Sequence, residues 1–200
     1  MREYLKLAAH LAATAVVLPS VISFRVRRLI VGADRAITGS TQMWGLVPGM
    51  TGEYLRRAFL CRTLPRCART AAIEFGAVFS SAQAEIGERA YIGPRCHIGF
   101  AAIGADALLA AGVHVPSGAR THGTGDPDAP IRSQPGEKQM VRIGAGAWIG
   151  SAAVVMADVG RDTVVGAGAV VTRPLPDRVV AGGVPARVLK LRDAQQVASA

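Results

Sequence analysis

The sequence predicts a mainly β protein: a parallel β-helix with an α-helical extension before it and a short segment after it. Three observations predict this fold. Across residues 86–172 a branched aliphatic residue followed by a small one recurs in steps of six. Residues 1–70 lack this period and hold a long apolar run instead. Half of the 200 residues are hydrophobic but only 5% are aromatic, which fits a thin core of stacked aliphatic side chains.

The hexad is clearest in Ile86-Gly87, Ile92-Gly93 and Ile98-Gly99, and it resumes at Ile143-Gly144 and Ile149-Gly150. No α-helix returns a residue to the same face every six residues, so the period favours short strands joined by corners, three to a turn. The aliphatic side chains should stack inward, and the small residue should give the corner room to bend. One coil cannot bury its own apolar face, so only stacked coils are stable.

Two steps of the repeat are irregular. Ile98 to Ile103 is five residues, and Val155 to Val159 is four. We interpret both as shortened corners that reshape the prism locally without ending the coil.

The hexads and the ending Gly182-Gly183-Val184-Pro185-Ala186-Arg187-Val188 resemble the hexapeptide-repeat acyltransferases. The similarity is closest to bacterial O-acetyltransferases that act on sugars and polysaccharide precursors, and it spans residues 73–192. It implies a left-handed coil, an exception to the right-handed crossover rule. It also implies a homotrimer that uses acetyl-CoA as co-substrate.

Residues 1–70 are predicted to form a basic, apolar α-helical extension that contacts a membrane. Residues 7–24 are almost entirely apolar but contain Pro19, which should kink a helix. The run is marginal for a bilayer span, which needs about twenty apolar residues. A helix dipping into the inner leaflet, a true span, a helix packed on a partner subunit and a soluble amphipathic helix all remain open. Residues 53–64 predict a second helix that caps the first coil, whose strand edges would otherwise be unpaired.

Charge is distributed unevenly between the two parts. Residues 1–70 hold eleven Lys or Arg and three Asp or Glu, a net of +8, whereas residues 71–200 hold twelve and eleven, a net of +1. A basic segment beside an apolar one favours an anionic membrane surface, and no binding motif supports nucleic acid. Three cysteines without a CxxC pattern argue against a disulfide scaffold or a zinc site. We expect a location at the cytoplasmic face of the inner membrane.

Residues 71–192 are assigned to the β-helix, with a loop at residues 121–141, and residues 193–200 to a frayed tail. Long loops inside compact repeats are usually functional. His122 lies at the mouth of this loop, where the similar sugar O-acetyltransferases carry their catalytic histidine. An alcohol is a poor nucleophile until a base takes its proton, and an imidazole with a pKa of about 6.5 suits that task.

The resemblance also implies which residues contact acetyl-CoA. It places Trp148 in the acceptor and thioester pocket and Ser151 beside the thioester carbonyl or the pantetheine arm. Small and basic residues near the end of the coil would complete the coenzyme site, with cations for its phosphates. These residues are Ala167, Thr172, Arg173, Arg187 and Lys190.

The predicted function is acetyl-CoA-dependent O-acetylation of a sugar hydroxyl on a polysaccharide or lipid-linked glycan precursor, with no metal. Two alternatives stay open. One is a non-catalytic β-helix scaffold at the membrane. The other is a metal protein like the β-helical carbonic anhydrases, with His97, His114 and His122 as ligands from neighbouring subunits. His10 is expected at the membrane interface.

Overall fold

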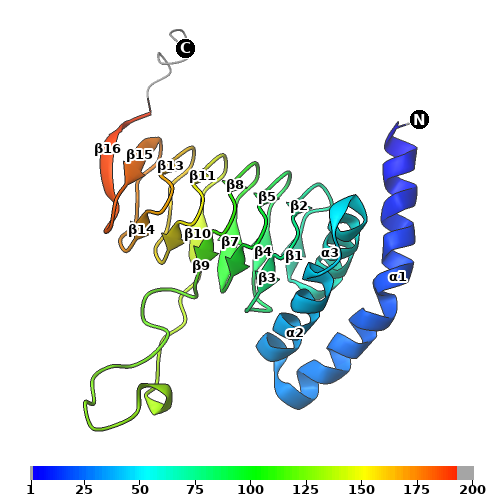
Figure 1. Ribbon diagram of the computed structural model, residues 1–200, viewed down its shortest axis with the longest axis horizontal. Helices are drawn as coiled ribbons and strands as arrows, with labels where there is room; N and C mark the ends of the chain where they lie inside the picture. Colours follow the sequence, from blue (N-terminus) through cyan, green and yellow to red (C-terminus); the bar gives the residue numbers. More distant parts are fainter. Residues whose placement is uncertain (1, 193–200) are drawn as a thin grey trace.

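The computed structural model describes residues 2–192, so the predicted tail at residues 193–200 lies outside the described residues. The chain begins with three helices: α1 (Arg2–Val31), α2 (Ala33–Gly45) and α3 (Gly49–Thr63). The predicted helix at residues 53–64 is thus confirmed as part of α3, whereas α2 was not predicted. The residues that α2 buries are mostly small or polar: Ala36, Ile37, Ser40, Thr41 and Gly45. α1 continues through Pro19 as one helix, and Figure 1 shows it curving in its second half.

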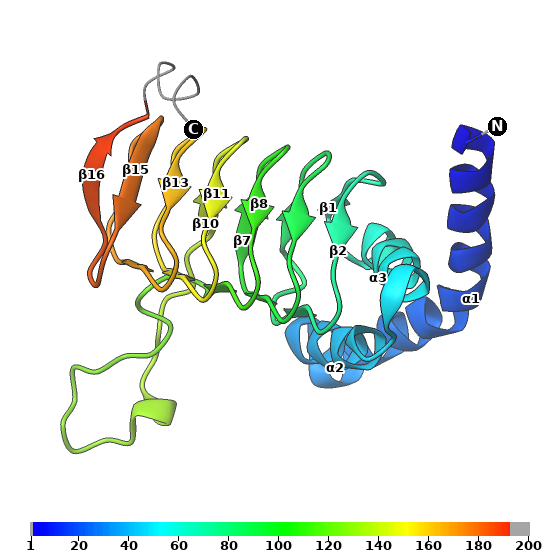
Figure 2. The same ribbon diagram turned by 45° about the horizontal axis from the view of Figure 1, so that its top comes forward.

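The rest of the chain winds into a parallel β-helix of about six turns, as predicted, with three sheets as its sides (Figures 1 and 2). The strands within each sheet are parallel except for the last strand of one sheet. Sheet A consists of β1 (Arg66–Cys67), β4 (Glu85–Ile86), β7 (Ala101–Ile103) and β10 (Val141–Ile143). Sheet B consists of β2 (Ala72–Ile73), β5 (Tyr91–Ile92), β8 (Leu108–Leu109), β11 (Trp148–Ile149), β13 (Val164–Val165), β15 (Val179–Gly182) and β16 (Arg187–Leu191). Sheet C consists of β3 (Val78–Phe79), β6 (His97–Ile98), β9 (His114–Val115), β12 (Val154–Val155) and β14 (Val170–Val171).

The core of the coil is the stack of aliphatic residues that the hexads predict. In sheet B, Ile149 pairs in register with Leu109 on one side and Val165 on the other. All three side chains are at most 1% exposed. Each strand is only two residues long in most coils, so one side chain points inward and its neighbour points outward.

The irregular steps of the repeat all fall where the chain passes from sheet C to sheet A. Ile98 ends a strand of sheet C and Ile103 lies in sheet A. Val155 likewise ends β12, and Val159 bridges in parallel to Ile143. The coil therefore continues across both slips, as predicted. We call this edge of the prism the C–A edge.

The small residue after each aliphatic one is needed for a different reason from the predicted one. A Cβ at Gly144 would lie 2.5 Å from the backbone nitrogen of Arg161, one coil further on. The glycine is thus required by close approach of stacked backbones. The left-handed turn of a corner falls later in the hexad, for example at Asp162 with φ 55°.

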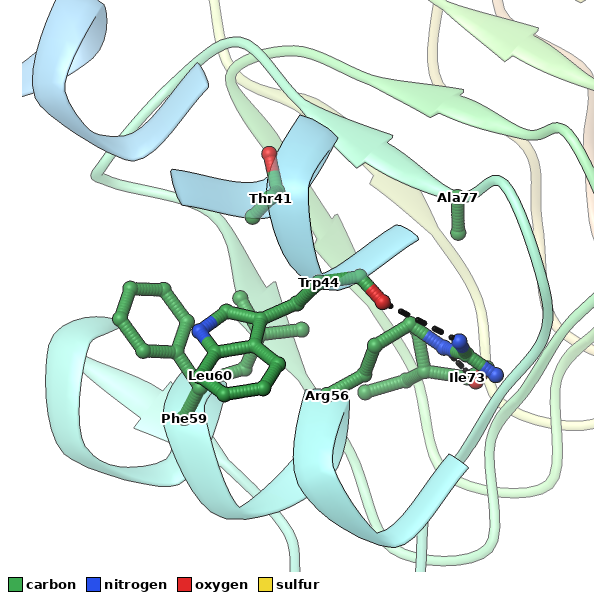
Figure 3. A pocket seen from close by; sticks show the side chains of 7 residues that line it. All are labelled: Thr41, Trp44, Arg56, Phe59, Leu60, Ile73 and Ala77. Atoms are coloured by element: carbon green, nitrogen blue, oxygen red, sulfur yellow. Dashed lines mark hydrogen bonds between the residues drawn. The ribbon is translucent and has the colours of Figure 1, made fainter. Parts of the chain in front are cut away.

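Helices α2 and α3 cap the first coil by supplying hydrogen-bond partners to its free edge. Arg56 Nε donates to the Ile73 carbonyl at 2.8 Å, as Figure 3 shows, and Arg57 Nη1 donates to the Ala71 carbonyl at 3.0 Å. The Phe79 amide donates to Thr41 Oγ1 at 3.1 Å. These contacts satisfy backbone groups that have no preceding coil to pair with.

The last coil is closed differently. β16 turns back and pairs antiparallel with β15. The segment between them pairs with β14, because the Ala186 amide donates to the Val170 carbonyl at 2.8 Å. At the opposite end, the first coil strand begins at Arg66, inside the segment that the sequence assigned to the extension.

Candidate active site

The long loop leaves the coil between β9 and β10, at the C–A edge, and projects away from the prism (Figure 1). Its two limbs are held together at the base. The Glu137 amide donates to the Arg120 carbonyl at 2.7 Å, and the two side chains form an ion pair at 3.2 Å. A Cβ at Gly136 would lie 2.1 Å from the Thr121 carbonyl oxygen, so the limbs touch there.

His122 therefore stands on a braced part of the loop, next to Thr121, with its side chain exposed. Within the described part of the chain, neither a hydrogen bond nor an ion pair of its imidazole occurs. Glu137 pairs with Arg120, and among the described residues no hydrogen bond joins its carboxylate to His122. The imidazole is accessible to an incoming molecule.

A second contact braces the loop from a distant part of the chain. Lys138 Nζ lies 2.6 Å from Asp34 Oδ2, at the start of α2. Burial raises the pKa of Asp34, but the Lys138 ammonium and the Ala82 amide outweigh this and lower it overall. The two residues are 104 positions apart, so no local sequence signal could have revealed their contact.

Thr172 and Arg173 lie on the same edge as the base of the loop. They follow β14, which is two coils beyond β9 in sheet C. At about 4.8 Å between neighbouring strands, two coils separate their backbones by about 10 Å. Both side chains are exposed. The structure thus aligns a base candidate and a cation along one edge.

Three further predicted site residues do not lie on the C–A edge: Trp148, Ser151 and Ala167. Trp148 points outward from sheet B and is 51% exposed. Ser151 and Ala167 occupy stacked corners between sheets B and C, which we call the B–C edge. A Cβ at Gly150 would lie 2.4 Å from the Ala167 nitrogen, so the two corners are in direct backbone contact.

The two late basic residues lie on β16, at the end of the coil furthest from the helices (Figure 1). Arg187 is exposed and donates from Nη1 to the Ala186 carbonyl at 3.1 Å. Lys190 is exposed and pairs in register with Val180 of β15. Both place positive charge on sheet B beside the last coil, whereas Arg173 lies on the C–A edge.

Sheet C separates the two edges, and it carries a feature that the sequence pattern did not reveal. The rings of His97 and His114 stack with centroids 4.7 Å apart. Burial, followed by the neighbouring His114, lowers the pKa of His97. The repeat does contain a signal for this contact, because the two histidines occupy equivalent positions of successive coils, where side chains stack.

The stacked pair supplies only two of the three histidines that the carbonic-anhydrase-like metal site would need. His122 lies on the loop rather than on this face, so one chain does not bring the three histidines together. Over residues 8–192, whose side chains the structure describes, no group of three or more His, Cys, Asp or Glu could hold a metal ion.

Known proteins with similar sequences support the assignment of a β-helix built from hexapeptide repeats. A family model described as the hexapeptide repeat of succinyl-transferase matches residues 83–116 and 140–173. Galactoside O-acetyltransferase from Escherichia coli (strain K12) is 46% identical over 52 residues, which are 25% of this chain and 26% of that protein. The chain spans about a quarter of the length of the curated relatives it matches.

Two solved structures share the fold. A maltose O-acetyltransferase from Clostridium difficile 630 matches with a TM-score of 0.70 and 23% identity, covering 82% of this chain and 89% of that one. A galactoside acetyltransferase in complex with coenzyme A matches with a TM-score of 0.64 and 21% identity, covering 80% and 81%. The period, the stacked core and the matched model agree that residues 83–116 and 140–173 consist of hexapeptide repeats, and the solved structures show that the fold is shared.

Proposed function

We propose that the chain is an O-acetyltransferase that moves the acetyl group of acetyl-CoA to a sugar hydroxyl, with His122 as general base. One observation carries the proposal. The only histidine of the long loop stands at the loop's braced base, on the edge that presents Thr172 and Arg173 two coils away. The names of the relatives support the reaction class, and one fold relative was solved with coenzyme A.

The reaction follows from the chemistry of an exposed imidazole. His122 takes the proton of the sugar hydroxyl, and the hydroxyl oxygen attacks the thioester carbonyl. The tetrahedral intermediate then expels the coenzyme A sulfur, which recovers the proton from the imidazolium. The products are the acetyl ester and free coenzyme A. Ser151 would donate a hydrogen bond to the thioester oxygen as negative charge develops there.

Coenzyme A would lie along the coil, with its phosphates toward the last turns. Arg173, Arg187 and Lys190 supply cations at that end. The stacked corners at Ser151 and Ala167 expose backbone groups for the pantetheine arm. Thr172 adds a hydroxyl beside Arg173.

A neighbouring subunit would complete the site. On one chain, sheet C separates His122 from Ser151 and Ala167. A groove between the C–A edge of one copy and the B–C edge of another would bring the two sets together, as a homotrimer would allow. Exposed Leu108 and Trp148 on sheet B offer apolar surface for such a contact.

The acceptor would be the sugar of a polysaccharide or lipid-linked glycan precursor. Cytoplasmic acetyl-CoA would keep the reaction on the cytoplasmic side of the inner membrane. A lipid-linked acceptor would require the protein to contact the membrane.

The test is turnover of acetyl-CoA with a panel of mono- and disaccharides as acceptors. The rate is measured from the release of the free thiol of coenzyme A. His122→Ala should lower kcat by at least about a hundredfold, within the range for loss of a general base. Coenzyme binding, measured by calorimetric titration, should be retained. Unchanged turnover in His122→Ala would rule out this base.

A matched pair of arginines tests the coenzyme site. Arg173→Ala should weaken coenzyme A binding by about tenfold, because one phosphate contact is lost. Arg142 is also exposed but lies on sheet A and faces Asp158, so Arg142→Ala should bind normally. If the unmodified protein binds no acetyl-CoA, the scaffold alternative is favoured instead.

A further inference from the structure

Helix α1 is apolar on two opposite faces, of which the protein covers one. The covered face consists of Ala13, Val17, Val21 and Phe24, all at most 6% exposed. Their spacing of three and four residues is that of one helical stripe. This stripe packs against α3, where the rings of Phe24 and Phe59 meet edge to face with centroids 6.2 Å apart.

The opposite face is a continuous apolar stripe, which we call the outer stripe. Its members recur at helical spacing and are between 49% and 84% exposed. They are Leu11, Leu18, Ile22, Val26 and Leu29. The stripe is about 27 Å long, at 1.5 Å per residue. An exposed apolar surface of this length and regularity marks an interaction site.

The charges around the outer stripe indicate what covers it. Arg25 and Arg28 are exposed beside its C-terminal half. Within residues 8–192, neither forms an ion pair. An apolar stripe flanked by unpaired cations is complementary to an anionic lipid surface, which offers hydrocarbon below and phosphate at the rim.

Length and composition alone would also permit a span. The segment Ala8–Val31 is the one helix among the described residues that is long and apolar enough to cross a membrane. Its packing argues against crossing. Arg27 Nη2 donates to Ser40 Oγ at 2.8 Å, and Trp44 Nε1 donates to Ser20 Oγ at 3.1 Å, so α1 is tied to α2.

The next layer is too charged to follow α1 into hydrocarbon. α3 packs on the covered stripe and carries buried Arg56 and Arg57. Charged side chains are rare in hydrocarbon because removing them from water is costly. A crossing α1 would either carry these arginines with it or give up its packing.

We propose that α1 is a monotopic helix that lies in the plane of an anionic bilayer surface, with the outer stripe in the lipid. Figures 1 and 2 show α1 as the outermost layer at the N-terminal end of the coil. The outer stripe faces away from α3, so the coil stands on the membrane and β16 is furthest from it. This pose presents the C–A edge to a sugar that projects from the lipid headgroups.

The test is flotation of the full-length protein with vesicles of phosphatidylcholine and phosphatidylglycerol, compared with phosphatidylcholine alone. We expect binding that is at least tenfold stronger on the anionic vesicles. The double variant Leu18→Glu/Ile22→Glu should lose at least tenfold of this binding. Ile131 in the loop is as exposed as Ile22, at 57% each, so Ile131→Glu is the matched control and should bind normally.

Protease accessibility tests the orientation of α1 in the membrane. A tag placed before α1 and one placed after the coil should both remain open to protease when the protein is bound to sealed vesicles. Protection of the N-terminal tag would overturn the in-plane helix in favour of a span. Absence of vesicle binding, together with an oligomer that the double variant dissociates in light scattering, would assign the outer stripe to a second copy.

Failure of this proposal can be told apart from failure of the proposed enzyme activity. The double variant should acetylate a water-soluble sugar at the normal rate and keep the helical circular dichroism of the unmodified protein. Loss of that dichroism would mean that the variant is misfolded. Single variants Leu18→Ser and Ile22→Ser would then replace it, and unchanged vesicle binding by both would overturn the proposal.

Discussion

The coil and the helical extension bury different kinds of side chain. Of the buried polar or charged residues among residues 8–192, most lie in the extension: His10, Ser40, Thr41, Arg56 and Arg57. Within the coil, backbone groups pair with the next coil, and most buried side chains are apolar. Thr163 is an exception, because its hydroxyl donates to the Pro176 carbonyl at 2.7 Å. The first coil has no predecessor, so side chains of the extension must supply its missing partners. The coil thus depends on the repeated filling of its apolar interior, whereas the cap depends on specific side-chain hydrogen-bond donors and acceptors.

The largest expected loss of stability comes from interrupting the stack. Ile149→Ala would leave a cavity between Leu109 and Val165 and should lower the free energy of unfolding by about 4 kcal/mol. Val164 points outward from sheet B, so Val164→Ala should cost less than about 1 kcal/mol. Urea unfolding followed by circular dichroism measures both. Equal losses would mean that the inward stack is not the main source of stability.

Removing one residue of the cap should cost almost as much. Arg56→Ala deletes the donors to the Ile73 and Val47 carbonyls and should destabilise the protein by about 3 kcal/mol. Arg35 on α2 is exposed, and its replacement by Ala should be nearly neutral. Hydrogen exchange should show the first coil opening before the later ones in Arg56→Ala. Uniform exchange along the coil would contradict a local capping role.

A smaller, pH-dependent effect is expected at His10. It was predicted at the membrane interface, but it is 7% exposed and both ring nitrogens are buried without a hydrogen-bond partner. Burial, followed by Arg69, Arg62 and Arg57, lowers its pKa in the folded chain.

The unfolded chain therefore takes up a proton below about pH 6.5 that the folded chain resists, and stability should fall as the pH drops through this range. His10→Leu should raise stability by about 1 kcal/mol and flatten this slope. Thermal melting between pH 5 and pH 8 tests the prediction. An unchanged slope would show that His10 does not contribute to it.

The smallest effect distinguishes the thiols of the two regions. A hydrogen bond with Cys67 lowers the pKa of Cys61 on α3, and nearby arginines act in the same direction. Burial inside the coil raises the pKa of Cys96 to about 11. Because the thiolate is the nucleophile, iodoacetamide at pH 8 should alkylate Cys61 at least about tenfold faster than Cys96. Peptide mass spectrometry would reveal the opposite order if the assignment is wrong.

The sequence by itself determined the coil, its core and its interruptions. The hexads from Ile86 onward predict the inward stack, and the two short steps predict corners without breaks. This succeeds because each hexad repeats one local structure, so its pattern is read many times. The break at residues 121–141 likewise locates the loop and His122, since a repeat makes any departure from it visible.

Only the tertiary structure decided how the parts meet. Arg56 reaches Ile73, and Lys138 reaches Asp34, through contacts that no periodic signal encodes. The candidate site residues divide among the C–A edge, the B–C edge and sheet B because a three-sided coil sends positions a few residues apart to different sides. The composition of α1 shows that it is apolar. Which of its two apolar faces remains exposed depends on the packing of α2 and α3 against the opposite face. Contacts between residues that are distant in sequence determine which face is covered, and a local sequence pattern holds no information about such contacts.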